Sequence, residues 1–504
     1  MKRRDLLKAA ALLPVATLGT AHAASACKKE KMSFDEEFDI VIVGSGFAGL
    51  AAAYSANKAG LKNILIIEKM VAYGGASAIC GGIVCMPGTK LQAKHGIEDS
   101  PELLVKDMVK VGRGFNHPEL AMTMATQAST AYDMMMECGV QFKDKLLRLG
   151  SHSAPRGHIP TNASGGGIVV PMHKHLLEKG IKFQNRTNVS AIISDDSGVS
   201  GVSGVAVQTN FDSKTGKFDK ELTYKSRHGV VIASGGWGSD KQFVKTTMPV
   251  YADLRATAQS GATADMIKSL LAAGSLPVML DMYQLGPWGS PDERPAGPGS
   301  FFSDYAFSEG IAVDPKTGKR FVNELSSRRT RSEAELVVMQ KGTKETPNYP
   351  FTFCGEETTK HAEGFYAAYR DGAVKKSNSV AELAKRHGVD EATLTQTIAE
   401  WNEIVKGAPD PFNKPLDVRT ELKAPFYSFR LSPVLHYCMG GVAITPDAQV
   451  IDATTCEPIE GLFAAGEIAG GVHGMDRLGG CSSIDGLVFG QIAGRTAAKY
   501  KANA

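Results

Sequence analysis

Hydrophobic residues occur along much of this chain in short runs that end in glycine. Residues 39–43 are mostly β-branched and lead into Gly44, Gly46 and Gly49, which have G-x-G-x-x-G spacing. Residues 50–59 are rich in alanine and contain no proline, a pattern that favours a helix. The stretch therefore predicts a strand, a tight turn and a helix, an arrangement that can hold a dinucleotide pyrophosphate at a helix N-terminus.

A second hydrophobic run follows this helix. Residues 61–67 predict another buried strand, which ends in Glu68. An acidic residue about 20 positions beyond the glycines stands where a ribose hydroxyl needs a hydrogen-bond acceptor. The alternative is a strand–helix junction that is punctuated by glycine and binds nothing, but Glu68 favours dinucleotide binding.

The pattern further along the chain predicts alternating helices and strands. Helical spacing at 102–111 and 118–138 predicts two or three helices between residues 100 and 147, with the methionines at 134–136 packed in the core. A helix at 171–179 follows, and residues 181–193 and 202–208 predict the strands of a small β meander. Residues 228–236 predict a buried strand that enters a glycine turn and closes the main sheet, and residues 487–500 predict a closing helix.

Composition changes near residue 280. Prolines, glycines and aromatic residues gather at 283–307, and helical patterns resume at 332–340 and 379–405. Glycine-rich turns return in the last part of the chain. We therefore expect a cofactor-binding domain formed by residues 33–279 and 432–504, with a separate domain, residues 280–431, inserted between its two parts.

The chain has 504 residues, of which 43% are hydrophobic and 22% charged, and its formal net charge is +3. This near balance favours neither nucleic acid nor an acidic membrane surface as a partner. Residues 2–8 contain twin arginines, an apolar run follows at 9–17, and Ala21 and Ala23 form an A-x-A cleavage site. We expect a twin-arginine signal peptide at residues 1–26, rather than a chance pair of arginines, and a soluble periplasmic protein. No later apolar run reaches the length of a membrane span.

The cysteines argue against a metal site. Eight occur, and none of them form a C-x-x-C or C-x-x-C-H motif, which disfavours zinc, iron–sulfur clusters and covalently attached haem. Export permits disulfides. Cys80 and Cys85 could pair, but their glycine-rich neighbourhood fits a cofactor loop better, and most of the cysteines are expected to be small core residues.

Glycine turns recur from residue 44 to residue 480. They occur near residues 74–75, 81–82, 165–167, 235–236, 440–441, 466, 470–471 and 479–480. A flavin is held along its whole length by many backbone contacts, whereas one βαβ unit would serve a nicotinamide. The distribution of glycines therefore favours FAD over NAD.

The sequence resembles the flavoprotein subunits of fumarate reductases and succinate dehydrogenases, and most closely the soluble periplasmic flavocytochrome c fumarate reductases and urocanate reductases. Residues 41–49, 74–77, 261–265, 318–324, 436–441 and 466–480 carry the resemblance, which covers nearly the whole mature chain. It implies an α/β fold in which a Rossmann-like FAD-binding domain of the GR2 type carries an inserted α+β clamp, or capping, domain. The histidine that links FAD in membrane-bound relatives has no evident match, which implies noncovalent FAD.

The expected cofactor-binding residues come from many segments of the chain. They are Gly44, Gly46, Phe47, Ala48, Gly49, Glu68, Lys69, Gly74, Gly75, Ala76, Ser77, Gly81, Gly82, Gly166, Gly167, Val189, Ala233, Ser234, Gly235, Gly236, Asp265, Gly466, Glu467, Arg477, Gly480, Ser482, Ser483 and Ile484.

The resemblance also implies a reaction. In that family reduced flavin gives hydride from N5 to the β carbon of an α,β-unsaturated acid, and an arginine protonates the α carbon. The matching position here is Arg328, and Arg329 or Arg331 takes the role if the alignment shifts. Guanidinium is normally permanently charged, so such an acid must be reprotonated at once. The alternative for this cluster is a basic helix start that binds solvent or carboxylates.

A second arginine of the family binds the substrate carboxylate in two-point contact, and it matches Arg477. Other parts of the family's site differ in this chain. Tyr437 replaces a carboxylate-binding histidine and has His436 beside it, and a second histidine, from an H-P-T segment, is replaced within residues 284–288. A threonine–glutamate pair and a further arginine, which bind substrate and relay protons, have no clear equivalents, and Ser303 with Asp304 is the nearest fit.

These differences favour an enoate other than fumarate. A monocarboxylate of the acrylate, methacrylate, cinnamate or urocanate type suits the aromatic residues Tyr283, Trp288, Phe301, Phe302 and Tyr437, unless these side chains only pack the clamp domain. Fumarate itself is one alternative substrate. A ketosteroid-type flavin dehydrogenase that uses Tyr437 is an alternative enzyme.

A non-catalytic flavin-binding or electron-transfer module is an alternative of another class, but it needs neither a clamp nor paired arginines. Because no haem-binding motif occurs in the chain, we expect a separate periplasmic multihaem cytochrome c to supply electrons.

Overall fold

The computed structural model describes residues 33–194, 201–415 and 420–500. The predicted signal peptide and Cys27 lie outside these residues. From Asp35 onward the chain forms one folded unit, so the boundaries predicted near residues 280 and 431 stay a prediction. No helix in the described part is long and apolar enough to cross a membrane.

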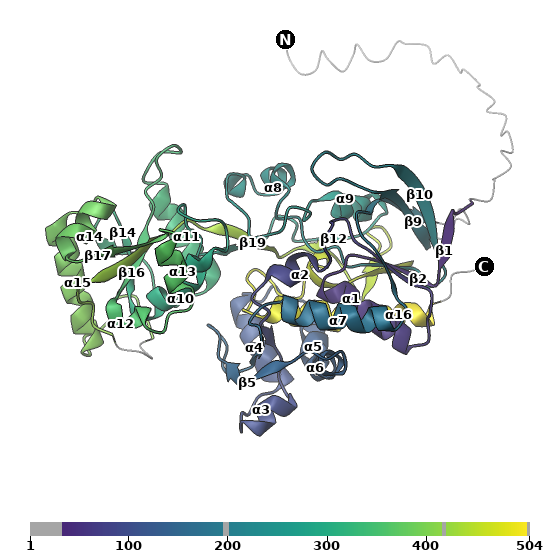
Figure 1. Ribbon diagram of the computed structural model, residues 1–504, viewed down its shortest axis with the longest axis horizontal. Coiled ribbons are helices and arrows are strands. Elements are labelled where there is room, and N and C mark those ends of the chain that lie inside the picture. The colour runs from purple at the N-terminus through teal and green to yellow at the C-terminus, as the bar shows by residue number, and fades with distance from the viewer. Residues whose placement is uncertain (1–32, 195–200, 416–419, 501–504) are drawn as a thin grey trace, which may run out of the picture. The chain divides into compact units, whose positions relative to one another are not determined.

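A six-stranded sheet forms the centre of the cofactor-binding part (Figure 1). Five parallel strands lie in the order β22, β11, β2, β3, β7, and β21 pairs antiparallel at the edge beside β22. Their bounds are β2 Ile40–Val43, β3 Ile64–Ile67, β7 Lys182–Gln184, β11 Val230–Ile232, β21 Gln449–Ile451 and β22 Pro458–Ala464. Strands β2, β3 and β11 are buried throughout, which explains their unbroken hydrophobic runs.

Two helices with small residues at their contact pack beside this sheet. They are α1 (Phe47–Lys58) and α16 (Cys481–Lys499). A Cβ atom at Gly490 would lie 2.3 Å from the Ala48 carbonyl oxygen, and one at Gly494 would lie 2.1 Å from that of Ala52. The alanines and glycines therefore let the two helix backbones approach closely. Both helices begin earlier than predicted, because Gly46 and Gly480 are their N-caps and the glycine motifs run directly into helix.

The predicted β meander is largely confirmed, with one correction. Strands β8 (Asn188–Ser194), β9 (Val202–Thr209) and β10 (Lys220–Ser226) form an antiparallel sheet, and β1 (Glu36–Phe38) pairs parallel with β10. Strand β7, which was expected in this meander, instead pairs parallel with β3 of the central sheet. Its three residues fill the open edge beside β3.

The region between residues 75 and 178 is mostly helical. The helices are α2 Gly75–Ile79, α3 Lys90–Lys94, α4 Pro101–Val111, α5 Pro118–Thr126, α6 Ala128–Glu137 and α7 Gly166–Glu178, and the strands β4 Val84–Cys85, β5 Phe142–Leu147 and β6 Gly157–Pro160 form a small sheet. The helix predicted at 118–138 is two helices, because Gln127 leaves the helical backbone region. Met134 and Met135 are buried as expected, but Met136 is exposed.

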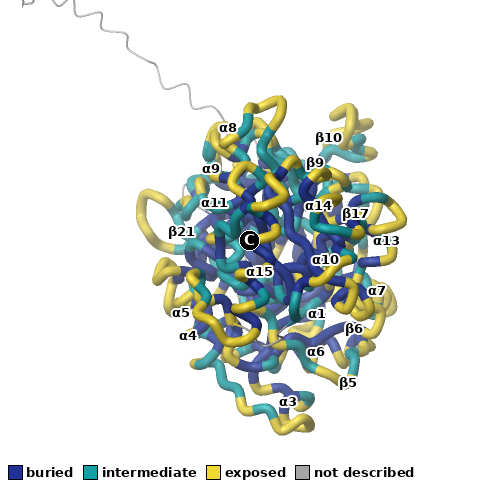
Figure 2. Tube along the Cα trace, turned by 90° about the vertical axis from the view of Figure 1, so that its left-hand side faces the viewer, coloured by how far each residue is buried: buried dark blue, intermediate teal, exposed yellow. Residues whose placement is uncertain are grey.

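The segment from 298 to 430 contains its own sheet. Five antiparallel strands lie in the order β15 (Lys319–Arg320), β14 (Ile311–Asp314), β16 (Phe351–Gly355), β18 (Phe426–Arg430) and β17 (Val374–Ser377), and Figure 1 draws them mainly in green. Because side chains alternate along β14, Ile311 and Val313 join one hydrophobic cluster and Ala312 joins another. Figure 2 shows buried backbone inside and exposed loops outside.

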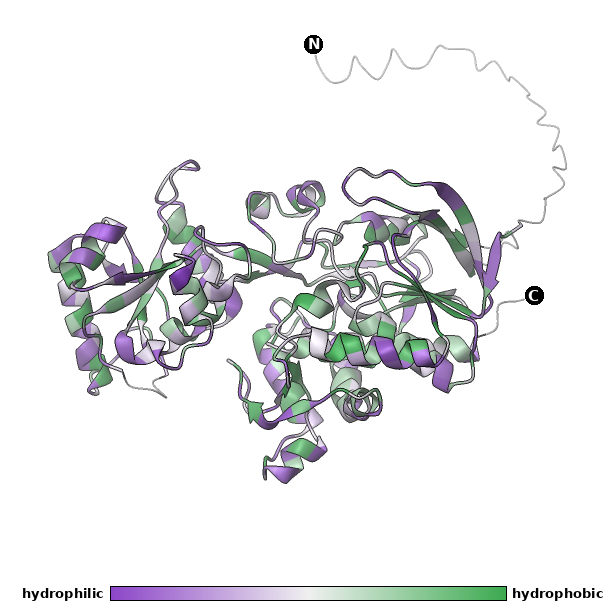
Figure 3. Cartoon of the chain, viewed as in Figure 1, coloured by the Kyte–Doolittle hydropathy of each residue, from purple (hydrophilic) through white to green (hydrophobic). Residues whose placement is uncertain are grey.

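Helices cover both hydrophobic clusters. They are α10 Pro298–Glu309, α11 Arg328–Met339, α12 Glu356–Thr359, α13 Phe365–Arg370, α14 Val380–His387 and α15 Glu391–Val405. Helices α14 and α15 carry hydrophobic residues on one side and hydrophilic residues on the other (Figure 3). The single helical stretch predicted at 379–405 is interrupted because Gly388 ends α14 in the left-handed conformation.

Short elements join the central sheet region to the sheet of β14–β18. Strands β13 (Tyr283–Gly286) and β19 (Val434–Cys438) pair antiparallel, as do β12 (Pro277–Val278) and β20 (Gly441–Val442). The remaining elements are α8 Lys241–Thr247, α9 Asp265–Ala272, η1 Pro249–Tyr251 and η2 Gly466–Ile468. The pairing of β13 with β19 contains an irregularity between Gln284 and Leu285, and this irregularity lies at the candidate site.

Candidate functional site

The glycine motif lies where the parallel strands end. Gly44 follows β2 with φ of 109°, and a Cβ atom there would lie 2.2 Å from the carbonyl oxygen of Ala233. The Phe47 N–H donates to Ser77 Oγ (3.0 Å), which ties the first turn of α1 to α2. Glu68, at the end of β3, accepts from Ser45 Oγ (2.5 Å). The glycine motif at 44–49 and the glycines at 74–75 therefore meet at the carboxyl edge of the sheet. Ligands usually bind at this edge in such sheets.

Other predicted cofactor residues lie against the same edge. Lys69 Nζ donates to Asp265 (3.2 Å), and Gly466 has φ of 76°, with the position of its missing Cβ 3.2 Å from Ala48 Cβ. Gly82 lies against the backbone of Ser164, in the loop that enters Gly166 and Gly167 at the start of α7. Gly75 and Gly81 face open space. Val189 is buried in β8, two residues after Thr187, whose N–H donates to the Glu68 carbonyl oxygen.

These residues fit a dinucleotide cofactor. Ser234 follows β11, and its hydroxyl is buried with no hydrogen-bond partner in the described part of the chain. Helices α1 and α16 begin at glycine N-caps, Gly46 and Gly480, and the first N–H groups of a helix have no partner inside it. An anionic pyrophosphate and the hydroxyls of a bound dinucleotide would satisfy such groups.

Glu467 lies just after β22, at the same carboxyl edge of the central sheet. Its Oε1 accepts from the Cys438 N–H (2.8 Å), and burial raises the pKa of Glu467. A Cβ atom at Gly236 would lie 2.5 Å from that oxygen, so the turn after β11 requires glycine beside the carboxylate. Glu467 thus links the cofactor edge to β19, which carries His436 and Tyr437.

Gln284 connects the two arginines that the sequence singled out. Its Oε1 accepts from Arg328 Nη1 (3.1 Å) and from Arg477 Nη2 (2.9 Å). Its Nε2 donates to Asp476 Oδ1 and to the Arg477 carbonyl oxygen (2.8 Å). Burial, followed by the charge of Arg477, lowers the pKa of Arg328 to about 9. Sequence analysis missed Gln284, although it lies in the 284–288 segment where the family's histidine is absent.

The irregular pairing in β19 brings two neighbouring rings to these arginines. Gln284 pairs with Tyr437 and Leu285 pairs with Leu435, so His436 is the extra residue of a bulge. Bulges of this kind change the direction of a side chain. The Arg477 guanidinium lies 4.6 Å from the centre of the Tyr437 ring, and burial and then the charges of Arg328 and Arg477 lower the pKa of His436.

Trp288 forms an apolar wall beside Arg328. The guanidinium lies 4.6 Å from the indole centre, and His436 meets the same indole edge-on at 5.1 Å. The His436 ring also shares a hydrogen bond with the hydroxyl of Thr257 (2.9 Å). A Cβ atom at Gly286 would lie 2.7 Å from Cε2 of Trp288. Glycine at 286 therefore leaves the room that the indole occupies.

Ser303 and Asp304, expected together in the substrate site, differ in their surroundings. Ser303 is fully buried and donates its hydroxyl to the Ser300 carbonyl oxygen (2.9 Å), so it presents no free hydroxyl. Asp304 is open to solvent, yet the protein around it raises its pKa, against the charges of Arg331 and Arg328.

The other arginines of α11 have different partners. Arg329 Nε forms an ion pair with Glu333 (2.8 Å), one turn further along the same helix. The Arg331 guanidinium lies 4.8 Å from the centre of the Phe307 ring on α10. Of the three candidates for the acid, Arg328 alone has a guanidinium group that shares a side-chain acceptor with the Arg477 guanidinium in the described structure.

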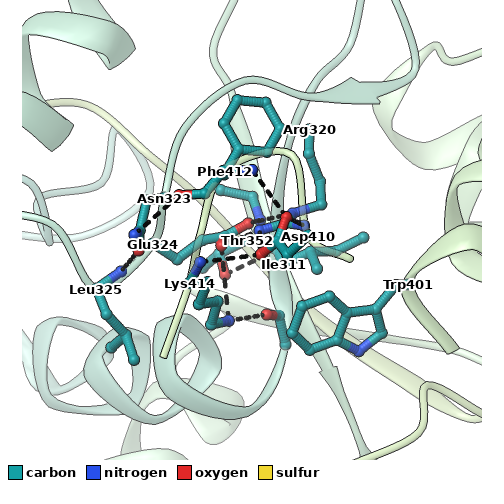
Figure 4. A network of polar contacts seen from close by, with 12 residues as sticks. Ile311, Arg320, Asn323, Glu324, Leu325, Thr352, Trp401, Asp410, Phe412 and Lys414 are labelled. Carbon is teal, nitrogen blue, oxygen red and sulfur yellow. Dashed lines mark hydrogen bonds and ion pairs between the residues drawn. The ribbon is translucent and has the colours of Figure 1, made fainter. Parts of the chain in front are cut away.

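A buried ionic network positions the loop before Arg328 (Figure 4). Arg320 donates to both oxygens of Glu324 (2.9 and 2.7 Å) and to Asp410 (2.9 Å). Glu324 also accepts from the Ala312 N–H (3.0 Å) and lies 3.6 Å from Lys414 Nζ. Residues 320–324 therefore hold the loop to β14, and the side chain of Ser327 then caps α11.

Comparison with known proteins agrees with this geometry. A family model described as an FAD binding domain matches residues 39–483. The chain belongs to this family. It is 37% identical to the acrylate reductase flavoprotein subunit of Shewanella woodyi, over 92% of each chain. It is 30% identical to a urocanate reductase of Eggerthella lenta, over 92% of this chain and 75% of that one.

Solved structures extend the comparison to the fold. The open conformation of a flavocytochrome c3 fumarate reductase has a TM-score of 0.76 and 30% identity, covering 93% of this chain and 79% of that one. A 3-ketosteroid dehydrogenase of Rhodococcus jostii has a TM-score of 0.72 at 23% identity, over 94% and 99% of the two chains, and this likeness concerns the fold alone. The protein is thus an FAD-dependent oxidoreductase, and the expected fold class and cofactor are confirmed.

Proposed function

We propose that this flavoprotein reduces the carbon–carbon double bond of an α,β-unsaturated monocarboxylate, with acrylate as the leading candidate. The observation that carries this proposal is the pairing of Arg328 and Arg477 on one oxygen of Gln284, beside the apolar face of Trp288. Two cationic groups can bind one carboxylate and supply a proton, whereas an indole offers no second carboxylate contact. The named reaction of the Shewanella woodyi relative supports the same substrate class.

Each side chain then has a role. FAD, when bound at this edge and reduced, would supply the hydride that the β carbon of the enoate needs. Arg477 holds the substrate carboxylate, and the Tyr437 ring below its guanidinium fixes the plane of that group. Arg328 donates a proton from its guanidinium to the α carbon. Its pKa of about 9 makes this donation easier than from an ordinary arginine, while keeping the group protonated at neutral pH.

Tyr437 and His436 complete the substrate side in this proposal. Burial raises the pKa of Tyr437 well above its usual value, so its hydroxyl keeps its proton and can donate to a carboxylate. The same observation disfavours a dehydrogenase in which Tyr437 acts as a base. His436 is neutral, because burial and the two arginines lower its pKa. The charge of Asp304 opposes the fall in the Arg328 pKa, whereas Ser303 donates its hydroxyl within α10 and binds no substrate in this proposal.

Fumarate reduction is the second candidate, because relatives named fumarate reductase match at 30% and 31% identity. A second carboxylate would need a polar partner where Trp288 lies. Larger monocarboxylates of the methacrylate, cinnamate or urocanate type are further candidates, and the 30% identical urocanate reductase supports the last of these.

The cellular setting is part of the proposal. We expect noncovalent FAD, export through residues 1–26 to the periplasm, and a separate multihaem cytochrome c as electron donor. A relative named fumarate reductase (cytochrome), from Shewanella frigidimarina, supports a cytochrome as the class of electron donor. This chain covers 77% of the length of that relative.

The deciding experiment compares substrates. The purified holoenzyme is assayed with reduced methyl viologen against acrylate, methacrylate, cinnamate, urocanate and fumarate. We expect the largest kcat/KM for a monocarboxylate. Faster turnover of fumarate than of every monocarboxylate would refute the substrate class, and a bound flavin that no enoate reoxidises would refute the reaction.

A further inference from the structure

A fully buried arginine holds the loop that precedes β6. Arg156 is 0% exposed, and its Nε and Nη2 donate to the two oxygens of Asp99 (2.8 and 2.7 Å). Its Nη1 donates to Asp107 on α4 (2.6 Å), and the Ser153 N–H donates to the same carboxylate (2.8 Å). Loss of one partner would leave a buried charge uncompensated, so these contacts keep residues 153–156 fixed against α4.

The same guanidinium determines which nitrogen of His152 carries the proton. Arg156 Nη1 lies 3.2 Å from His152 Nδ1. Because a guanidinium can only donate, Nδ1 is the acceptor. Burial lowers the pKa of His152 to about 4, so the ring carries a single proton at neutral pH. That proton is therefore on Nε2, which donates to the carbonyl oxygen of Gly479 (2.9 Å).

The turn before His152 has a strained backbone. Ser151 has φ of 67°, in the left-handed region that few residues other than glycine adopt. The His152 N–H donates to the Leu149 carbonyl oxygen (3.1 Å), and Arg148 Nε donates to the His152 carbonyl oxygen (3.0 Å). Strain of this kind persists where surrounding contacts hold it, and it is often found at functional sites. Here the contacts hold the His152 ring in the interior, where it is 3% exposed.

Gly479, which accepts from His152, lies next to both arginines of the site. It comes two positions after Arg477 and directly before Gly480, the N-cap of α16. A Cβ atom at Gly479 would lie 3.3 Å from Arg328 Nη2, so the acid arginine lies against this part of the backbone. Arg477 Nη1 donates to the Leu478 carbonyl oxygen within the same turn (3.1 Å). A shift of the turn would therefore change the position of Arg477 relative to Arg328.

We propose that His152 is a positioning residue of the active site, because its Nε2–H holds the Gly479 carbonyl oxygen and keeps the turn at 477–480 against Arg328. It acts through the backbone of Gly479 and not on the substrate. A neutral ring suits this place, since an imidazolium would be repelled by Arg156 and Arg328. The inference rests on the proposed function, in which Arg328 is the acid and Arg477 binds the carboxylate.

The test compares two replacements of His152 in the holoenzyme. His152→Leu removes the donor, whereas His152→Gln places an amide N–H near the position of Nε2. We expect kcat/KM for acrylate to fall roughly tenfold in His152→Leu, near the upper end of the contribution of one hydrogen bond. His152→Gln should recover most of this loss. Rates are expressed per bound flavin, so that a change in FAD content does not enter the comparison.

His158→Leu is the matched control. His158 is also 0% exposed, and its ring bonds to the Arg156 carbonyl oxygen and the Thr89 hydroxyl (both 2.9 Å). In the described structure it forms no hydrogen bond with residues 477–480. Both leucine variants should lower the thermal stability, but His158→Leu should keep the wild-type kcat/KM. Equal values of kcat/KM in the two leucine variants would overturn the inference, while acrylate reduction by the wild type would leave the proposed function standing.

The tautomer of His152 gives a readout that needs no turnover. In holoenzyme labelled with 15N-histidine, the His152 signals are assigned by their loss in His152→Gln. They should show a ring protonated on Nε2 alone between about pH 6 and 8, the range in which an ordinary histidine titrates. A proton on Nδ1, or on both nitrogens, would overturn the inference even if acrylate is reduced. If the wild type reduces no enoate, the proposed function fails, and the tautomer still decides whether His152 donates to Gly479.

Discussion

Arg328 and Arg477 donate to the same atom, Oε1 of Gln284, at 3.1 and 2.9 Å. Burial lowers the pKa of Arg328, and repulsion from the neighbouring Arg477 guanidinium lowers it further. The opposing charges of Asp304 and Asp476 keep the pair together. The amide of Gln284 is therefore the neutral contact that lets Arg328, the proposed acid, and Arg477, the proposed carboxylate-binding group, lie side by side.

Removing this shared acceptor should separate the two arginines. Gln284→Leu keeps the volume of the side chain and removes its four hydrogen bonds, the two that Oε1 accepts from the arginines and the two that Nε2 donates. A hydrogen bond to a charged group contributes about 1.5–3 kcal/mol, so kcat/KM should fall by roughly ten- to a hundredfold. FAD content should stay near that of the wild type, because in the described structure Gln284 forms no hydrogen bond with the glycine motif at 44–49 or with Glu68, and it reaches the cofactor side only through Asp476 and Arg477. Steady-state assays and flavin absorbance measure both effects.

Gln340→Leu, at the exposed C-terminal end of α11, is the control for loss of an amide. It should change neither quantity. A kcat/KM for Gln284→Leu that equals the wild-type value would show that the arginines keep their positions without their common acceptor.

Comparison of Arg328→Ala with Arg329→Ala identifies the acid. We expect Arg328→Ala to lose at least about a hundredfold in kcat, as expected for loss of a general acid, and to retain bound FAD. Arg329 pairs with Glu333, so Arg329→Ala should reduce activity far less. Single-turnover reoxidation of dithionite-reduced enzyme by acrylate measures the step directly. The reverse ranking of the two variants would transfer the role to Arg329.

The sequence allowed the cofactor side of this protein to be predicted more completely than the substrate side. A glycine such as Gly44 is required by local geometry, here a positive φ and a backbone 2.2 Å away, so its role is visible in the motif. Gln284 had no such signature. Its role depends on contacts with Arg477, 193 positions away along the chain, and with Arg328 on α11.

Tertiary packing explains where the structure departs from what the sequence indicated. Ser303 stays a predicted binding residue, but it lies on the buried side of α10 and its hydroxyl bonds within the helix. Strand β7 resembled part of the meander because its three residues carry no pattern that distinguishes the two sheets. In each case tertiary packing, rather than local preference, decided the outcome.

The pH dependence of turnover should follow Arg328. The protonated guanidinium is the active form, so kcat is expected to be constant near neutral pH and to fall as pH rises through about 9, the lowered pKa of Arg328. Rates at saturating acrylate between about pH 6 and 10.5 measure the profile. Flavin reduction by dithionite over the same range is the control, and a flat kcat profile would argue against Arg328 as the acid.

Substrate preference should respond to the pair Gly286 and Trp288. A side chain at 286 collides with the indole, because a Cβ atom there would lie 2.7 Å from Trp288, so both positions must change together. The double variant Gly286→His with Trp288→Thr places an imidazole near Arg328 and removes the apolar wall. We expect the ratio of fumarate to acrylate kcat/KM to rise by at least about tenfold, the factor that corresponds to 1.4 kcal/mol of added binding.

Trp288→Thr alone is the control for this change. It opens space without adding a polar group, so it should weaken acrylate reduction and give little gain with fumarate. Flavin content and thermal unfolding of both variants would show whether the fold is kept. An equal gain in the single and double variants would mean that the size of the cavity, and not a second carboxylate contact, sets the preference for a monocarboxylate.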